Sequence, residues 1–125
     1  MAEDENLALV IDYMTRIARG DVEGALALCH DDIAFRGPDG STTGKDGLRA
    51  LFAQIAPLLV NPMEQEIVGT TCQGNRVAIE AQASTMLANG REYANIYHFL
   101  FEVEGGMICA AREYCDTTRG AAFAA

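Results

Sequence analysis

Glu113 is the residue of this sequence whose surroundings best suit proton-transfer chemistry. If its segment is a strand, Cys109, Ala111 and Cys115 lie on the same face, because side chains alternate along a strand. A carboxyl among small apolar neighbours loses solvation, which raises its pKa and lets it hold or pass a proton near neutral pH. Solvent on that face, or an ion pair with an arginine, would instead make Glu113 structural, and alternation alone leaves both interpretations open.

The neighbouring segments offer an aromatic face and a second acid. Between Glu92 and Glu104 the alternate residues form a face that we expect to be concave: Tyr93, Asn95, Tyr97, Phe99 and Phe101. Glu80 and Gln82 alternate with the apolar residues Val77, Ile79 and Ala81. Taken alone, the Glu80 face resembles an ordinary solvent-facing surface. It gains chemical interest only if it lines a cavity.

Three helices are predicted before the strands that carry these residues. Apolar residues recur at helical spacing from Asn6 to Arg19, and Gly20 ends that helix. A short second helix is expected from Val22 to Cys29, followed by a strand from Ile33 to Arg36. A third helix is expected from Lys45 to Leu59.

Four long strands are predicted to follow the third helix. They run from Met63 to Cys72, Arg76 to Leu87, Glu92 to Glu104 and Met107 to Asp116, with glycine-containing hairpin signals between them. The tail from Thr117 to Ala125 is predicted to be weakly structured. This order predicts one α+β domain over residues 1–125, with the three N-terminal helices packed on the concave face of a curved antiparallel sheet.

Composition excludes several classes of partner. The 125-residue chain carries a net charge of −9, which argues against binding nucleic acid or an anionic membrane surface. Three acids among the first five residues are unlike a secretory signal, so we expect a cytoplasmic location. The four cysteines form no Cys-x-x-Cys pair, and neither histidine stands at ligand spacing from a cysteine. We therefore expect no metal and no cofactor.

Three stretches carry a resemblance to a known superfamily. They are Tyr13 to Phe35, with Gly20-Asp21 and His30-Asp31-Asp32; Gly44-Lys45-Asp46; and Asn89-Gly90-Arg91-Glu92-Tyr93 through Gly105-Gly106 to Arg112-Glu113-Tyr114-Cys115-Asp116. Together they resemble the nuclear-transport-factor-2-like superfamily, which includes SnoaL-like polyketide cyclases, steroid Δ-isomerases and limonene-1,2-epoxide hydrolases. The resemblance covers nearly the whole chain and implies a single SnoaL-like domain with a cone-shaped sheet around a cavity. Members often pair through the convex face, so it also implies a homodimer through Ile96, His98 and Leu100.

The resemblance suggests residue roles as well. In spacing the chain is nearest to limonene epoxide hydrolases, whose catalytic Arg-x-Asp pair falls on Glu80 and Gln82 and whose last-strand Asp falls on Glu113. Their water-orienting Tyr and Asn fall on Phe35 and Gly37, which lack the needed groups. The match implies that Glu80, Gln82 and Glu113 share one cavity. In steroid isomerases the oxyanion donors correspond to Tyr13 and a position near Tyr97, and the base position falls on Gly37.

The sequence therefore predicts a small apolar or polycyclic ligand in a central cavity. Its predicted wall consists of Tyr13, Met14, Ile17, Phe35, Ile55, Leu59, Met86, Asn95, Tyr97, Phe99 and Cys115. The favoured function is cofactor-free acid/base catalysis of cyclase, isomerase or hydratase type, with Glu113 as the acid/base and Glu80 and Gln82 tuning it. The alternatives are a non-catalytic ligand-binding or dimeric accessory domain, and an epoxide hydrolase with an altered polar set.

Overall fold

The N-terminal helix α1 (Ala2–Arg19) forms over the predicted apolar periodicity. In the computed structural model, which describes residues 2–124, its buried residues are Val10, Tyr13 and Met14. Gly20 follows with a φ of 84°, a left-handed conformation that glycine adopts without a steric penalty. The chain then enters α2 (Val22–Leu26), where the Asp21 carboxylate accepts a hydrogen bond from the backbone N–H of Gly24 at 3.0 Å.

Strand β1 (Cys29–Arg36) begins earlier than the sequence predicts, and α2 is correspondingly shorter. Cys29 is fully buried and pairs with Ile108. Pairing with the strand that contains Ile108 therefore makes a strand of residues whose local pattern favoured a helix. The turn after β1 leads into the two-residue strand β2 (Thr42–Thr43), which the sequence did not predict. Helix α3 (Lys45–Ile55) continues into the 3₁₀ helix η1 (Ala56–Leu58), where Pro57 lacks the N–H that a longer α-helix would need.

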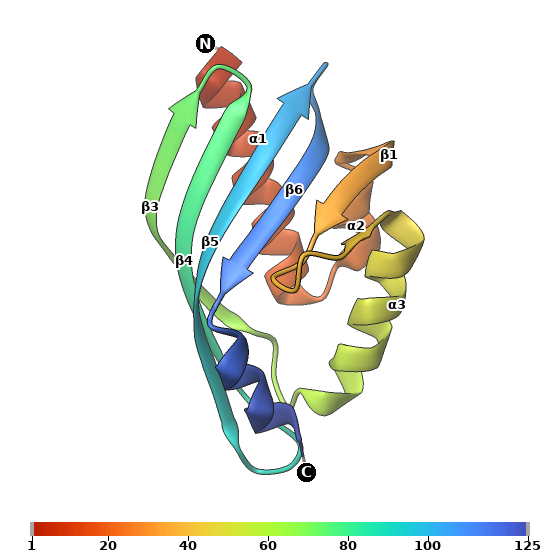
Figure 1. The fold of residues 1–125 in the computed structure, drawn as a ribbon, viewed down its shortest axis with the longest axis vertical. Coiled ribbons are helices and arrows are strands. Elements are labelled where there is room, and N and C mark those ends of the chain that lie inside the picture. Colours follow the sequence, from red (N-terminus) through yellow and green to blue (C-terminus); the bar gives the residue numbers. More distant parts are fainter. Residues whose placement is uncertain (1, 125) are drawn as a thin grey trace.

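The long strands β3 (Glu64–Gln73), β4 (Arg76–Met86), β5 (Glu92–Glu104) and β6 (Met107–Cys115) lie within about a residue of their predicted bounds. The six strands form one sheet in the order β2-β1-β6-β5-β4-β3. One neighbouring pair, β1 and β6, runs parallel, and the others are antiparallel. The predicted α+β architecture with a curved sheet is confirmed, and the sheet stays open rather than closing into a barrel (Figure 1).

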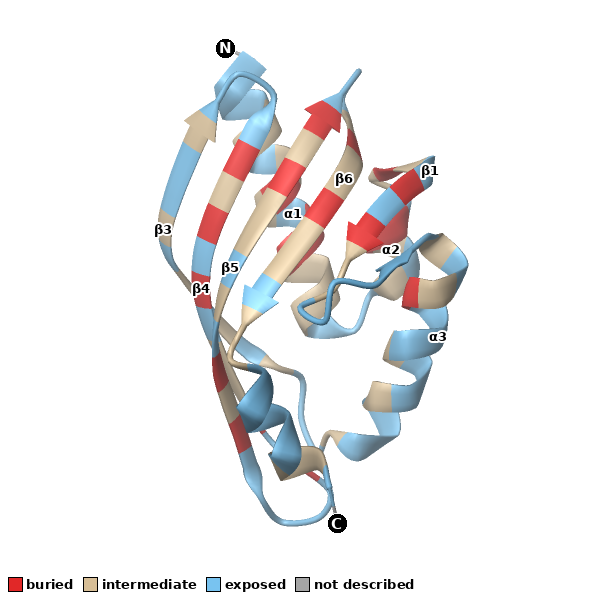
Figure 2. Ribbon diagram, in the orientation of Figure 1, coloured by how far each residue is buried: buried red, intermediate tan, exposed pale blue. Residues whose placement is uncertain are grey.

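The core lies between the concave face of the sheet and the helices. Figure 2 shows buried positions alternating with more exposed ones along β4 and β5, as expected for strands covered on one side. Helix α1 packs on β3, β4 and β6, whereas α3 packs mainly on β1, β2 and α2. The core includes Val10, Ala25, Leu26, Cys29, Ile33, Val77, Ile79, Phe101, Val103 and Ile108.

The C-terminal segment is more ordered than the sequence predicts. Residues Thr117–Phe123 form the 3₁₀ helix η2, which Asp116 caps by accepting from the N–H of Thr118 at 3.1 Å. The Phe123 ring lies 4.9 Å from the Tyr93 ring, and Asn89 donates from Nδ2 to the carbonyl of Ala122 at 2.9 Å. These contacts hold η2 against β5. Between residues 2 and 124, no helix combines the length and the apolar character needed to cross a membrane.

Candidate functional site

Strand register places Glu113 on the concave, helix-facing side of the sheet. Glu113 pairs with Phe99 of β5, and Phe99 pairs with Ile79 of β4. Directly paired residues share a face of a sheet, and Ile79 is fully buried in the core. The carboxyl of Glu113 therefore points toward the helices.

The Glu113 carboxyl is half-buried and has a single weak partner in the protein. The Cys115 thiol donates to Glu113 Oε2 over 3.8 Å. Among the residues that the structure describes, Glu113 joins no ion pair. Burial raises the pKa of Glu113 above its ordinary value, and the hydrogen bond from Cys115 offsets only part of that rise. The arginine-paired alternative is thus absent from this structure.

Tyr13 brings a hydroxyl from α1 to the same region. Its ring lies between those of Phe35 at 6.2 Å and Phe101 at 5.7 Å. Within residues 2–124 every side-chain oxygen or nitrogen cut off from solvent has a hydrogen-bond partner, yet the Tyr13 hydroxyl and Glu113 Oε1 have none. Both oxygens must therefore border accessible space. Burial first, and then the charges of Cys29 and Glu113, raise the pKa of Tyr13, so its hydroxyl keeps its proton.

Tyr97 supplies a second hydroxyl beside Glu113. It pairs with Cys115, so it is a diagonal neighbour of Glu113 on the concave face. Its ring stacks on Phe99 at 5.4 Å, and its hydroxyl lies 2.6 Å from that of Tyr93. Burial is the main cause that raises the pKa of Tyr97, and the Glu113 charge raises it further.

Asn95 and Tyr93 lie behind Tyr97 on the same strand face. Asn95 donates from Nδ2 to the Tyr93 hydroxyl at 2.9 Å and to the carbonyl of Asp116 at 3.0 Å. The sequence placed Asn95 in the wall but gave Tyr93 no role. Its spacing from Tyr97, four residues along one strand face, was the available signal.

The prediction that Glu80 and Gln82 share a cavity with Glu113 is wrong. Both are exposed and lie on the opposite face, where Glu80 pairs with His98 and Gln82 pairs with Ile96. Gln82 donates from Nε2 to Glu66 Oε1. Adjacent strand residues point to opposite faces, so a one-residue slip in matching a strand to its relatives exchanges its inner and outer sets.

Apart from Asn95, Tyr97 and Cys115, the predicted wall residues divide into three groups. Tyr13, Met14 and Phe35 are core residues, and Ile17 and Phe99 are partly buried against that core. Ile55 and Leu59 are half-buried at the end of α3 and beyond it. Met86 belongs elsewhere: it pairs with Glu92 on the outer face and is 44% exposed, so this wall prediction is wrong.

A family model described as the SnoaL-like domain matches residues 10–111. The chain belongs to the SnoaL-like domain family. No curated protein matches this sequence. Among the described residues of this SnoaL-like domain, no cluster of His, Cys, Asp or Glu is arranged to hold a metal ion.

Solved structures share the fold over almost the whole chain. An NTF2-like protein of unknown function from Burkholderia pseudomallei has a TM-score of 0.85 at 20% identity, covering 97% of this chain and 98% of that one. A proposed polyketide cyclase from Xanthomonas campestris has a TM-score of 0.82 at 19% identity, covering 96% of each chain. An epoxide hydrolase of Mycobacterium tuberculosis, described as LEH-like, has a TM-score of 0.80 at 18% identity, covering 95% and 88%. At these identities the likeness establishes the fold alone.

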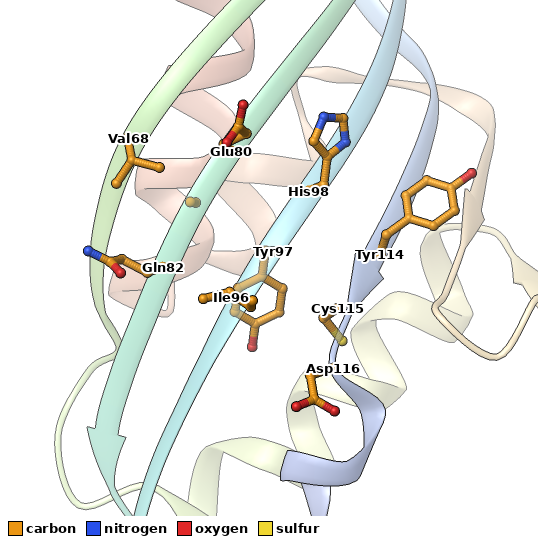
Figure 3. Close-up of a pocket in the computed structure, with 10 residues that line it drawn as sticks. Val68, Glu80, Gln82, Ile96, Tyr97, His98, Tyr114, Cys115 and Asp116 are labelled. Carbon is orange, nitrogen blue, oxygen red and sulfur yellow. The ribbon is translucent and has the colours of Figure 1, made fainter.

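The SnoaL-like domain has a shallow hollow of about 370 Å³ on the outer side of the sheet (Figure 3). Its outward-pointing lining includes Glu80, Gln82, Ile96, His98 and Tyr114. The apolar side chains in it are strongly exposed, with Ile96 at 57%. Tyr97, Cys115 and Asp116 also border this hollow, where β6 ends.

We expect the ionisation of Glu113 to lower the free energy of unfolding of the SnoaL-like domain as pH rises. Because folding raises the pKa of Glu113 above the ordinary value of 4.5, the unfolded chain releases this proton first. Below pH 4.5 the free energy of unfolding of the wild type should change with pH in the same way as that of Glu113→Gln. Above it, the wild type should lose stability relative to the variant until the pH passes the folded pKa of Glu113. A tenfold difference in proton affinity between the folded and unfolded chains corresponds to about 1.4 kcal/mol. Urea midpoints of both proteins, measured from about pH 4 to about pH 8, test this; a difference that does not change with pH would contradict it.

Proposed function

We propose that this SnoaL-like domain binds a small apolar molecule on the concave side of its sheet and transfers a proton on it through Glu113. The observation that carries the proposal is a desolvated carboxyl without a cationic partner, within electrostatic range of the Tyr13 hydroxyl, which borders accessible space. The partly buried ring of Phe99, backed by the core ring of Phe101, would give the ligand an apolar surface. The reaction class would be cyclase, isomerase or hydratase.

The arrangement of α3 supports a binding space in this region. Because α3 packs mainly on β1, β2 and α2, its apolar side chains Phe52 and Ile55 are only half-buried. Half-buried apolar side chains that face a sheet gain free energy when a ligand covers them, by roughly 25 cal/mol for each Å² removed from water.

Glu113 suits proton transfer because its raised pKa lies nearer to neutrality than that of an exposed carboxyl. In its protonated form it can donate to a substrate atom, and after ionisation it can take a proton back. Tyr13 retains its proton and can donate a hydrogen bond to a substrate oxygen. A carboxyl and a phenol on one apolar surface are sufficient for acid/base chemistry on a polarised double bond.

A ligand screen with chemical readout tests the proposal. Polycyclic ketones, quinones, and terpene and cycloalkene epoxides would each be incubated with the protein, with thermal shift reporting binding and mass spectrometry or chiral chromatography reporting conversion. We expect binding and Glu113-dependent conversion of a carbonyl compound. Tight binding without conversion over hours would favour the non-catalytic alternative instead. Diol formation would favour an epoxide hydrolase in which Glu113 works without Glu80 and Gln82.

We further propose that a second copy of the chain covers the outer face of the sheet. Val68, Ile96 and Tyr114 are 56%, 57% and 47% exposed there, which is a large apolar exposure for one sheet face. The face also carries His98 beside Glu80, so a two-fold contact can add polar contacts to the apolar ones.

Ile96→Asp is expected to convert such a dimer into monomers. The substitution would bury two carboxylates near each other at a two-fold interface, which costs several kcal/mol of association free energy. Sedimentation velocity over a range of protein concentrations measures the change. Leu58→Asp is the matched control, since Leu58 is a 42% exposed apolar residue outside this face. A wild type that stays monomeric at high concentration would refute the dimer.

A further inference from the structure

The orientation of the Asn95 amide is fixed by two backbone groups. Its Oδ1 accepts a hydrogen bond from the N–H of Ile96 at 2.8 Å, and its Nδ2 donates to the carbonyl of Asp116 at 3.0 Å. The flipped amide would set oxygen against that carbonyl and NH₂ against that N–H, losing both bonds. The group that faces the Tyr93 hydroxyl at 2.9 Å is therefore the NH₂, which can only donate.

This orientation fixes the direction of the next hydrogen bond. The Tyr93 oxygen accepts from Asn95, and its own proton needs an acceptor because Tyr93 is only 7% exposed. Among the described residues, the Tyr97 oxygen at 2.6 Å is the acceptor within reach. If Tyr97 donated to Tyr93 instead, the buried Tyr93 proton would stay unpaired, which is unfavourable. Tyr93 therefore donates to Tyr97, and the Tyr97 proton remains without a partner in the protein.

We propose that Asn95 and Tyr93 form a one-way donor chain that commits the Tyr97 hydroxyl to donating a hydrogen bond to a bound ligand, so that the ligand is a carbonyl compound or its enol form. The inference rests on the proposed function, because it names the substrate class of the same site. Tyr97 is the ligand-contacting residue, and Tyr93 and Asn95 are positioning residues.

Three further features of Tyr97 fit this role. Its side chain is half-buried, so part of it is open to a ligand, unlike the buried Tyr93. Burial raises its pKa, so the group keeps the proton that it would donate. Accepting a bond from Tyr93 polarises the Tyr97 O–H and strengthens its donation, since linked hydrogen bonds reinforce one another.

Two probes with one skeleton isolate the hydrogen bond. Tetralin and 1-tetralone differ only by the carbonyl group, and their dissociation constants would be measured by calorimetry. Tyr97→Phe should raise the dissociation constant of 1-tetralone about five- to tenfold. The dissociation constant of tetralin should stay the same, because the phenyl ring still stacks on Phe99. The Tyr114→Phe variant is the matched control, since this tyrosine lies on the outer face, and it should change neither constant.

Infrared spectroscopy of bound 1-tetralone separates positioning from structural support. In the wild type the carbonyl stretch should lie at lower frequency than in Tyr97→Phe, because the donated bond weakens the C=O bond. Tyr93→Phe keeps the ring against Phe123 and removes the hydroxyl that accepts from Asn95 and donates to Tyr97, so its stretch should fall between those two values. If Tyr93 had a purely structural role, Tyr93→Phe would weaken the binding of both probes alike and leave the carbonyl frequency at its wild-type value.

The outcomes separate this inference from the proposed function. If Tyr97→Phe changes the dissociation constants of both probes equally, or changes neither, the donor chain is refuted while apolar binding stands. If neither probe binds the wild type up to its solubility limit, apolar binding at this site fails for bicyclic ligands, and the inference fails with it. Selective weakening of 1-tetralone, together with the graded carbonyl frequency, supports the chain.

Discussion

Replacing Glu113 by glutamine should lower the rate of turnover by a factor of about 10²–10⁴. Glutamine has nearly the same shape and retains an acceptor for the Cys115 thiol, but it cannot exchange a proton at neutral pH. Ligand affinity should change little, because the partly buried ring of Phe99 and the core behind it are intact. Single-turnover kinetics on a substrate from the ligand screen measure the rate, and calorimetry measures the affinity.

Glu80→Gln is the matched control for that experiment. It makes the same chemical change on the outer face of β4, where Glu80 is exposed and pairs with His98. Its turnover should equal that of the wild type. A full rate in Glu113→Gln would remove the acid/base role. An equal loss in both variants would show that the two carboxyls act together, against the strand register described above.

Local alternation predicted the position of Glu113 better than the resemblance predicted the position of Glu80. Strand β6 places Ala111, Glu113 and Cys115 of the predicted apolar face toward the helices. A register irregularity opposite Glu102 and Val103 puts Ile108 on that side in place of Cys109. In β4 the buried residues Val77, Ile79 and Ala81 likewise identify the inner face from the sequence alone. Matching to epoxide hydrolases put Glu80 on that face instead, which is off by one residue. Strand alternation is the safer guide where identity is low.

Other features depend on contacts between distant segments and leave no local signal. The parallel pairing of β1 with β6 joins residues such as Phe35 and Ala111, which no hairpin rule connects. The tail forms η2 because Asn89 and Arg91 donate to the carbonyls of Ala122 and Ala124, so its order comes from the β4–β5 turn and not from its own composition. The donor chain through Tyr93 depends in the same way on the carbonyl of Asp116.

Leu26→Ala should destabilise the fold by about 2–5 kcal/mol. Leu26 is 1% exposed and belongs to the core that joins α1, α2 and the sheet. Removing its branched side chain loses apolar burial and leaves a cavity that five-residue α2 is too short to close by shifting. Since domains of this size are stable by only about 5–15 kcal/mol, the variant would lose a large share of its free energy of unfolding. Urea unfolding, followed by circular dichroism, measures the loss as a lower midpoint at unchanged slope.

Leu51→Ala is the matched control. It makes the same chemical change at a position that buries little apolar surface, because Leu51 is 46% exposed on α3. Its free energy of unfolding should stay within about 0.5 kcal/mol of the wild type. If the two variants lost equal stability, the burial of Leu26 in the core shared by α1, α2 and the sheet would be refuted. If Leu51→Ala instead weakened ligand binding without loss of stability, that result would add α3 to the ligand-contacting surface, since its half-buried apolar side chains lie on the same helix.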